Sequence, residues 1–343
     1  MDTRKLEEYL KEKREPSFRF KQICQAIFKD GVDSFSEIST ISKDLRSQLE
    51  QELKILPFKE VKVLISKDKN AFKALLKLED GNIIETVLLS PQEGHWSACI
   101  SSQVGCALGC VFCATGKNSF KRNLSGDEIA SQALFWRQYL RKNKLAGQFL
   151  NIVYMGMGEP FLNWENVKES LKTLIDERFF DFGRRNIAVS TVGIVDGMEK
   201  FAQDFPQINL ALSLHFADDA KRDLYMPINK KQGLSDLKNF LQNYFKTNTR
   251  KVFIEYILLR GINDSSEDAL KLAVFLKSIG KMQMIHVNLI RYNSIGGEFK
   301  ASSKETARRF KDELKQEKVH CTIRKSMGED IQGACGQLAG KVK

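Results

Sequence analysis

The sequence predicts an α/β protein whose main body is a partial (βα)6 barrel. Three observations support this fold class. From about residue 96 onward, apolar strand-like segments alternate with helical segments, which is the pattern of a parallel sheet. A short β-rich segment precedes them, and amphipathic helices open the chain. We therefore expect a helical accessory domain over residues 1–58, a β-hairpin or meander extension over 59–95 and the barrel core over 96–343.

The first 58 residues carry apolar side chains at helical spacing. Leu6 and Leu10 share one face of a helix, and Ile23 and Ile27 share one face of a second. Ser42 precedes a third apolar pattern and has the side chain of a helix N-cap. These patterns predict a small helical domain, and it is rich in lysine and arginine.

Residues 59–95 change to strand character. The apolar stretches are 62–65, 71–78 and 83–89. The sequence Asp80-Gly81-Asn82 separates the last two and is a turn signal. We therefore expect a pair of hairpins or a meander.

The barrel core is predicted from six apolar strands with helical patterns between them. The expected strands are 149–155, 186–191, 208–214, 251–258, 284–290 and 319–323. The expected helices include 126–142, 164–176, 234–244, 267–278 and 304–317. Six units fit an open or partial barrel better than a closed eight-stranded one. In such barrels the functional groups lie on the loops that follow the carboxyl ends of the strands.

The composition favours a partner with negative charge. Lysine and arginine number 54 against 43 acidic residues, which gives a net charge of +11. Composition alone is a weak argument, because exposed helix faces also carry lysine. No apolar run reaches the roughly 18–20 residues that a membrane span needs. The charged start of the chain lacks the apolar segment of a secretory signal. We expect a cytoplasmic protein with no membrane partner.

The seven cysteines argue against a secreted disulfide framework, because their number is odd and the chain is long. Cys106, Cys110 and Cys113 form a C-x3-C-x2-C motif in the loop after the first barrel strand. Three thiolates can hold three irons of a [4Fe–4S] cluster and leave the fourth iron open to a ligand. The alternative, a structural zinc site, needs four ligands, and no second cysteine pair lies nearby in the sequence.

Polar residues follow the carboxyl ends of the other barrel strands. Residues 155–160 read Met-Gly-Met-Gly-Glu-Pro, in which Gly158 permits close approach of a ligand and Glu159 offers a carboxylate to an ammonium group. Further residues at successive strand ends are Ser190, Ser213, Leu214, His215 and Asn293. Each alone is better explained as a strand-end cap, or for His215 also as a core histidine. Together they converge on one mouth of the barrel.

Two cysteines outside the motif are candidates for further chemistry. Cys335 lies among glycines near the C-terminus, as a reactive thiol on an accessible loop would. Cys99 lies seven residues before Cys106. For Cys335, the sequence alone gives an idle thiol about equal weight. Cys24 and Cys321 lie in ordinary helix and strand patterns, and we expect both to be packed thiols.

The cysteine motif resembles the signature of the radical S-adenosylmethionine (SAM) superfamily. Over nearly its whole length, the chain resembles the RlmN/Cfr family of RNA adenine methyltransferases. The matching stretches are 85–87, 99–113, 155–160, 213–215, 226–229, 287–290 and 330–338. The resemblance implies a radical SAM barrel that carries a [4Fe–4S] cluster and binds SAM at the open iron.

The resemblance also implies a role for each candidate residue. The cluster ligands would be Cys106, Cys110 and Cys113, and the SAM contacts would be Gly158, Glu159, Ser190, Ser213, Leu214, His215 and Asn293. Cys335 would carry the methyl group as S-methylcysteine. Cys99 would be the second thiol, which resolves the covalent intermediate. Glu85 would be the proton acceptor.

The implied mechanism uses two SAM molecules per turnover. The first methylates the Cys335 thiolate. The second is cleaved at the cluster, and the resulting 5′-deoxyadenosyl radical takes a hydrogen atom from that methyl group. The thiomethylene radical then adds to a non-nucleophilic carbon of adenine. Proton loss and attack of Cys99 on the Cys335 sulfur release the product and leave a disulfide, which cellular reductants reset.

Two products are compatible with the resemblance. RlmN-like members methylate C2 of the adenosine at position 2503 of 23S rRNA, and some also modify adenosine 37 of tRNA. Cfr-like members methylate C8 of the same rRNA adenosine and confer antibiotic resistance. Pro160 and residues 103–105 resemble RlmN, whereas residues 290–293 are closer to Cfr. We expect the C2 product.

The implied partners are 23S rRNA, tRNA, and an electron donor such as flavodoxin, and the family suggests a monomer. We expect the helical N-terminal domain to bind RNA. Other basic candidates are Lys121, Arg122, Arg184, Arg185, Arg222, Arg308, Arg309, Arg324 and Lys325.

Two other classes of function are weighed against this one. A radical SAM enzyme acting on a small molecule or peptide would not need the pair Cys99 and Cys335. A non-catalytic RNA-binding or cluster-sensing protein would be expected to lack a motif cysteine or Glu159, and all are present.

Overall fold

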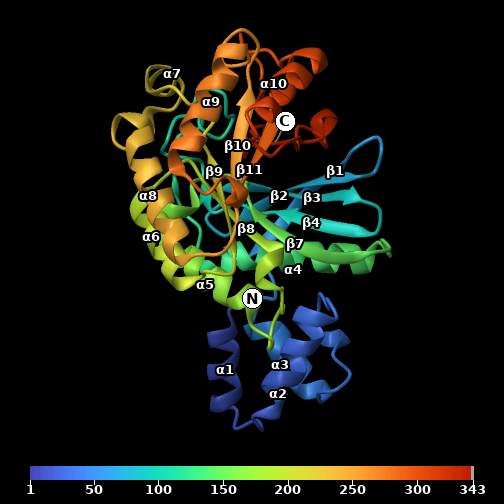
Figure 1. The fold of residues 1–343 in the computed structure, drawn as a ribbon. Helices are drawn as coiled ribbons and strands as arrows, with labels where there is room; N and C mark the ends of the chain where they lie inside the picture. The colour runs from blue at the N-terminus through green and yellow to red at the C-terminus, as the bar shows by residue number, and fades with distance from the viewer. Residues whose placement is uncertain (341–343) are drawn as a thin grey trace.

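One ten-stranded sheet runs through the molecule, and its strand order positions the other elements (Figure 1). The computed structural model describes residues 1–340. The strands, in the order in which they lie in the sheet, are β1 (Phe58–Ile65), β2 (Ala71–Leu78), β3 (Ile83–Gln92), β4 (His95–Cys99), β7 (Gln148–Tyr154), β8 (Ile187–Thr191), β9 (Asn209–Ser213), β10 (Val252–Leu258), β11 (Ile285–Arg291) and β12 (Cys321–Ile323). A separate two-stranded sheet consists of β5 (Gln103–Val104) and β6 (Arg122–Asn123).

The helices fall into an N-terminal group and a group that alternates with the parallel strands. The first group is α1 (Thr3–Glu12), α2 (Phe18–Cys24) and α3 (Lys43–Glu52), with a π-helical turn at Gln25–Lys29. The second group is α4 (Gly126–Lys142), α5 (Trp164–Ile175), α6 (Val195–Asp204), α7 (Asp219–Tyr225), α8 (Leu234–Thr247), α9 (Ser266–Ile279) and α10 (Lys304–Gln316). Short 3-10 helices lie at Phe35–Glu37, Pro160–Asn163, Arg184–Asn186, Pro227–Lys230, Met282–Met284 and Glu329–Ile331.

The sheet changes direction at β4. This strand pairs with β3 in antiparallel and with β7 in parallel orientation, and every neighbouring pair from β4 to β12 is parallel. The β-rich segment is therefore continuous with the barrel sheet. The boundary that we predicted between extension and core, between residues 95 and 96, falls inside β4. The predicted α/β fold, a mostly parallel sheet with a helical N-terminal region, is confirmed.

Local sequence signals start several of the helices. Ser125 caps α4 and Ser265 caps α9, and in both cases the third helical residue returns a side-chain hydrogen bond to the cap. Ser42 caps α3, as the sequence predicted. On α9, the side chains of Leu272, Ala273 and Leu276 are fully buried. Their spacing puts them on one face of the helix, and this face packs into the core.

The N-terminal helices, blue in Figure 1, pack against α4 and the segment that follows α5. The Gln138 amide donates to the main-chain oxygen of Val32 at 2.9 Å, and the Arg137 guanidinium donates to that of Phe28. The Phe28 ring lies 5.1 Å from the Phe179 ring, between centroids. Within residues 1–340, no helix combines the length and apolar character required to cross a membrane.

A buried hydrogen-bond chain connects β3, β4 and α4. The Thr86 hydroxyl donates to the Cys99 main-chain oxygen at 2.8 Å and accepts from the Trp136 indole nitrogen at 3.0 Å. Thr86 and Trp136 are both fully buried. This chain fixes the end of β4, which carries Cys99.

We predict that Thr86→Val lowers the free energy of unfolding by about 1–3 kcal/mol, because the buried indole N–H loses its acceptor. Denaturant unfolding of the two proteins measures the difference. Thr173→Val on the half-exposed side of α5 is the matched control, and it should cost less than about 0.5 kcal/mol. Equal losses in the two variants would contradict the role given to the Thr86 hydroxyl.

Candidate active site

A cavity opens at the carboxyl ends of the parallel strands, and we call it the reaction cavity. The predicted site residues that line it are Cys106, Cys110, Cys113, Gly158, Glu159, Ser190, Ser213, His215 and Cys335. They come from the cysteine loop after β4, from the ends of β7, β8 and β9, and from the C-terminal segment. The structure thus brings together side chains that are more than 200 positions apart in the chain.

The three motif cysteines approach the reaction cavity on one tightly folded loop. Gly105 has a positive φ of 77°, and a Cβ at this position would lie 2.3 Å from the Ser119 main-chain oxygen, so only glycine fits. Burial raises the pKa of Cys106 to about 12 and raises that of Cys110 further. Each of these thiols also interacts electrostatically with Cys113.

This donor set fits a cluster better than a single ion. Among residues 1–340, no three histidine, cysteine or acidic side chains are close enough together to hold one metal ion. A [4Fe–4S] cluster binds each thiolate through a different iron, so its ligands lie farther apart than those of one ion. Cys106, Cys110 and Cys113 are the residues that would hold it.

Glu159 is a buried carboxylate that lines the reaction cavity. Its Oε1 accepts from the main-chain N–H of Phe161 at 3.1 Å and its Oε2 from that of Val192 at 3.0 Å. Its own N–H donates to Gln103 Oε1 at 2.9 Å. Burial raises the pKa of Glu159 to about 7, against the lowering effect of these hydrogen bonds. The carboxylate is thus held rigidly, and a cation from a ligand would stabilise its charged form.

His215 lies at the cavity with a strained main chain. Its φ is 59°, which is uncommon for a residue with a side chain. Its Nδ1 accepts from the Ile257 N–H at 3.2 Å, and the Phe112 ring meets the imidazole edge-on at 5.2 Å between centroids. Burial, with a smaller effect of Arg222, lowers the pKa of His215 to about 3, so the ring is neutral at pH 7.

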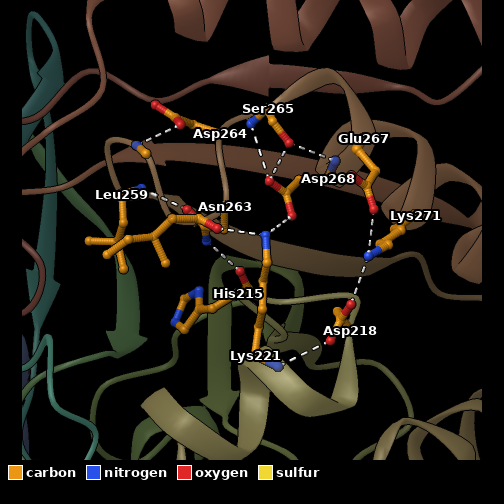
Figure 2. A network of polar contacts seen from close by, with 12 residues as sticks. His215, Asp218, Lys221, Leu259, Asn263, Asp264, Ser265, Glu267, Asp268 and Lys271 are labelled. Atoms are coloured by element: carbon orange, nitrogen blue, oxygen red, sulfur yellow. Dashed lines mark hydrogen bonds and ion pairs between the residues drawn. The ribbon is translucent and has the colours of Figure 1, made fainter.

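A polar network behind His215 holds its unusual main chain (Figure 2). The Asn263 amide donates to the His215 main-chain oxygen at 2.8 Å, and its Oδ1 accepts from the Leu259 N–H at 2.8 Å. Beside it, Lys221 Nζ donates to Asp268 at 2.5 Å, which joins α7 to α9. The network therefore fixes the loop after β9 relative to the loop after β10.

Leu214 and Asn293 do not line the reaction cavity. Leu214 is fully buried, and its main-chain oxygen accepts from Arg222 Nε at 3.2 Å. Asn293 is buried beside Cys335, and its amide donates to the Cys335 main-chain oxygen at 3.1 Å. In this arrangement Leu214 supports the end of β9 and Asn293 positions the C-terminal segment.

Cys335 is close enough to Cys99 to affect the ionisation of the Cys99 thiol. Cys335 has solvent-exposed surface at the cavity, whereas Cys99 is buried in β4. Burial raises the pKa of Cys99 to about 12, and the negative charge of a Cys335 thiolate would raise it further. Although part of its surface is exposed, desolvation by the surrounding protein raises the pKa of Cys335, and the Arg324 cation lowers it.

Glu85 lies in β3, beneath the C-terminal segment and outside the lining of the reaction cavity. Its Oε2 accepts from the Ala339 N–H at 3.1 Å, and its Oε1 is 3.5 Å from Lys73 Nζ. Both side chains of this ion pair are buried. Burial raises the pKa of Glu85, and Lys73 lowers it.

Glu255 and Lys73, which lie near the candidate thiols and Glu85, were not found as site residues from the sequence, and Arg324 was predicted only as an RNA contact. Glu255 lines the reaction cavity from the middle of β10, and Arg324 pairs with it at 3.3 Å. Lys73 faces Glu85 from β2. A charged residue within an otherwise apolar strand, as Glu255 and Lys73 are, was the one available signal.

The structure separates the basic candidates into different environments. The expectation that Arg222 contacts RNA is wrong, because its side chain is fully buried and bonded to Leu214, Asn229 and Val192. Arg122 is paired with Asp80 and Glu128. Arg308, Arg324 and Lys325 line a second cavity. Cys24 and Cys321 are buried, which confirms that they are packed thiols.

Family models match both parts of the chain. The model of the Radical SAM superfamily matches residues 100–273, and the model of the ribosomal RNA large subunit methyltransferase N-terminal domain matches residues 1–55. A crystal structure of a radical SAM methyltransferase from Sphaerobacter thermophilus superposes with a TM-score of 0.92 at 34% identity and covers 99% of this chain and 98% of its own.

Two curated relatives match nearly end to end. A probable dual-specificity RNA methyltransferase RlmN from Chlorobium phaeobacteroides is 40% identical over 333 residues, which are 95% of this chain and 90% of that protein. A ribosomal RNA large subunit methyltransferase Cfr from Clostridium botulinum is 40% identical over 325 residues, which are 94% of this chain and 92% of that protein. The resemblance noted in the sequence is confirmed, and the chain belongs to the RlmN/Cfr family of radical SAM RNA methyltransferases.

Proposed function

We propose that this protein methylates C2 of the adenosine at position 2503 of 23S rRNA, and adenosine 37 of tRNA, through an S-methylcysteine at Cys335. The observation that carries the proposal is the position of the Cys335 thiol. It lines the same cavity as the three motif cysteines, and it interacts electrostatically with Cys99. The proposed methyl carrier, the proposed cluster ligands and the proposed second thiol thus lie in one region of the molecule.

Two residues that resemble RlmN support the C2 product. Gln103 accepts the hydrogen bond from the Glu159 N–H, and its side chain packs against Gly158, where a Cβ would lie 2.5 Å from the Gln103 Cβ. Pro160 begins the 3-10 helix directly after Glu159. Gln103 and Pro160 therefore help to position the Glu159 carboxylate, which we propose binds SAM. The C8 product is the second candidate, and the sequence of residues 290–293 favours it.

The proposed roles of the SAM contacts follow from their chemistry. Glu159 would bind the SAM ammonium group, and Ser190 and Ser213, whose hydroxyls are 3.1 Å apart, would offer polar contacts beside it. When bound, a [4Fe–4S] cluster held by Cys106, Cys110 and Cys113 supplies the electron that cleaves SAM. Two SAM molecules would serve each turnover, one as methyl donor and one as radical source.

Cys335 would accept the first methyl group as a thiolate, and Arg324 favours that form because its cation lowers the pKa of the thiol. After the Cys335 methylene carbon has bonded to adenine and the adduct has lost one electron and one proton, Cys99 would attack the Cys335 sulfur. The Cys335 S–C bond would break, the released carbon would take up a proton to become the methyl group of the RNA, and a disulfide would remain. Glu85 would accept the proton that the base loses. Its Oε2 accepts from the N–H of Ala339, which lies four residues after Cys335 in the chain.

We further propose that residues 1–58 form an accessory RNA-binding domain, residues 59–95 an extension, and residues 96–343 the catalytic core. A monomer that receives electrons from a donor such as flavodoxin is the form we propose for the working enzyme.

We predict that Cys99→Ala stops turnover with RNA attached covalently to Cys335, because no thiol can displace the Cys335 sulfur. Denaturing electrophoresis and intact mass spectrometry detect the adduct. Cys321→Ala removes a buried thiol in β12 that donates to the Lys311 main-chain oxygen and does not line the reaction cavity, and this variant should form free methylated RNA normally. Free, normally methylated RNA from Cys99→Ala would contradict the role proposed for this cysteine.

We predict that Glu85→Gln retains methylation of Cys335 but lowers the yield of methylated RNA about 100-fold or more, as expected for loss of a general base. Nucleoside mass spectrometry measures the yield. The double variant Glu85→Gln with Lys73→Met removes both charges of the buried pair and should be equally inactive. Recovered activity in the double variant would mean that Glu85 acts only by balancing the charge of Lys73.

Nucleoside mass spectrometry also tests the product. The protein, with its cluster reconstituted anaerobically, is incubated with SAM, a reductant and a protein-free 23S rRNA fragment, and the digested RNA is compared with 2-methyladenosine and 8-methyladenosine standards. We predict 2-methyladenosine. 8-Methyladenosine would replace the C2 proposal with C8. Formation of 5′-deoxyadenosine without either product would mean that the substrate is wrong.

A further inference from the structure

A second cavity lies between the carboxyl ends of β11 and β12 and the first turns of α10, and we call it the basic cavity. Its volume is about 580 Å³. Its cationic side chains are Arg291, Lys304, Arg308, Arg324 and Lys325, and the single carboxylate among its lining residues is that of Glu329. Such an excess of one charge in a concave site attracts an anion.

Most of these cations are not neutralised by the protein. Of the five, only Arg324 has an ion pair within the part of the chain that the structure describes, and its partner is Glu255. The Arg291 guanidinium is held by the neutral main-chain oxygen of Ser302 at 3.0 Å. Lys304 and Arg308 are exposed on successive turns of α10. Positive charge is therefore concentrated here, with five cations against the one carboxylate of Glu329.

The basic cavity shares its wall with the reaction cavity. Asn293 lines the basic cavity, and its amide donates to the main-chain oxygen of Cys335, which lines the reaction cavity. Arg324 also lines the basic cavity, and it pairs with Glu255 of the reaction cavity at 3.3 Å. A polymer with one unit in the reaction cavity would therefore bring its neighbouring units to the basic cavity.

The shape and lining of the basic cavity favour RNA over an acidic protein. The volume is that of a small-molecule pocket, whereas protein partners usually meet on broader surfaces. Ala301, Ala307 and Ile323 give the cavity an apolar part beside its cations, which matches the sugar and phosphate of a nucleotide. Arg291 and Arg308 offer the forked donors that suit phosphate oxygens.

We propose that the basic cavity binds the sugar–phosphate backbone next to the adenosine that enters the reaction cavity. This inference rests on the proposed function and adds the location of the flanking RNA. Arg308 and Lys304 would contact phosphates from α10, and Arg291 and Lys325 would contact them from the strand ends.

The test is the affinity of the full-length protein, with its cluster reconstituted, for an unmodified 23S rRNA fragment over a series of KCl concentrations. Fluorescence anisotropy measures the affinity. The variant Lys304→Gln with Arg308→Gln should weaken binding about tenfold or more, since charged hydrogen bonds are lost. It should also reduce the slope of log affinity against log salt by about 1.5–2, because two phosphate contacts are lost.

The matched control is Lys311→Gln with Lys315→Gln, which removes two charges from α10 at the same spacing but outside the basic cavity. It should change affinity less than twofold, and thermal unfolding checks that both variants are folded. Equal weakening in the two variants, or none in the first, would overturn the inference. The inference would also be overturned if Lys304→Gln with Arg308→Gln left RNA affinity unchanged but slowed reduction of the protein by flavodoxin. An acidic protein would then be the occupant of the basic cavity.

The proposed function is read separately, from methylation of the same RNA by the wild-type protein. If the wild type forms no methyladenosine, the proposed function fails whatever the variants show. If the wild type methylates the RNA and the two double variants bind it equally, only the inference about the basic cavity fails.

Discussion

The arrangement of this site depends on main-chain hydrogen bonds that hold the C-terminal segment over the barrel mouth. The Gly336 oxygen accepts from the Ala114 N–H at 2.7 Å, beside the cysteine motif. The Leu338 oxygen accepts from the Thr115 hydroxyl at 2.7 Å, although the two residues are 223 positions apart. Because a buried main-chain group that lacks a partner is costly, these bonds favour one position of the segment. Cys335 is thereby held beside the loop that would bind the cluster.

The change of sheet direction at β4 is the second constraint. Val87 of β3 is paired with Cys99 of β4, and Cys99 is paired with Val153 of β7. One strand end therefore touches both the antiparallel extension and the parallel barrel. As a result, the β-rich segment supplies Glu85 and Lys73 to the floor beneath the C-terminal segment, while the barrel supplies the proposed cluster and SAM residues. The extension is structurally part of the site and not an appendage to it.

Sequence patterns predicted the regular parts of this fold because those parts follow local rules. The strand at 251–258 and β10 differ by one residue at one end, and Ser42 caps α3 as expected. The cysteine motif and Glu159 were found because their spacing and their position after strands are visible in the sequence. The basic charge of Arg222 gave no hint that its side chain is fully buried, since burial depends on how loops after different strands pack.

The residues that sequence reasoning missed, Glu255 and Lys73, have a common physical origin. Each is a charge inside an apolar strand, and each is paired with a charge from another strand or from a strand end. Glu255 and Arg324 are 69 positions apart and Lys73 and Glu85 are 12 apart, so no spacing within one strand connects either pair. Only the sheet order, in which β2 lies beside β3, brings Lys73 to Glu85.

Buried ion pairs of this kind are expensive, because the loss of hydration can exceed the attraction between the charges. The Lys73–Glu85 pair lies under the C-terminal segment, and the Arg324–Glu255 pair lies between the two cavities. An apolar pair of similar volume would serve stability at least as well. The Lys73–Glu85 pair contains the proposed proton acceptor, and the Arg324–Glu255 pair lies beside Cys335 and the basic cavity. These positions therefore indicate that the charges serve the chemistry of the site. On this view, Arg324 connects the two cavities: it lines the basic cavity proposed to hold RNA phosphate, it pairs with Glu255 of the reaction cavity, and its cation lowers the pKa of the thiol that would carry the methyl group.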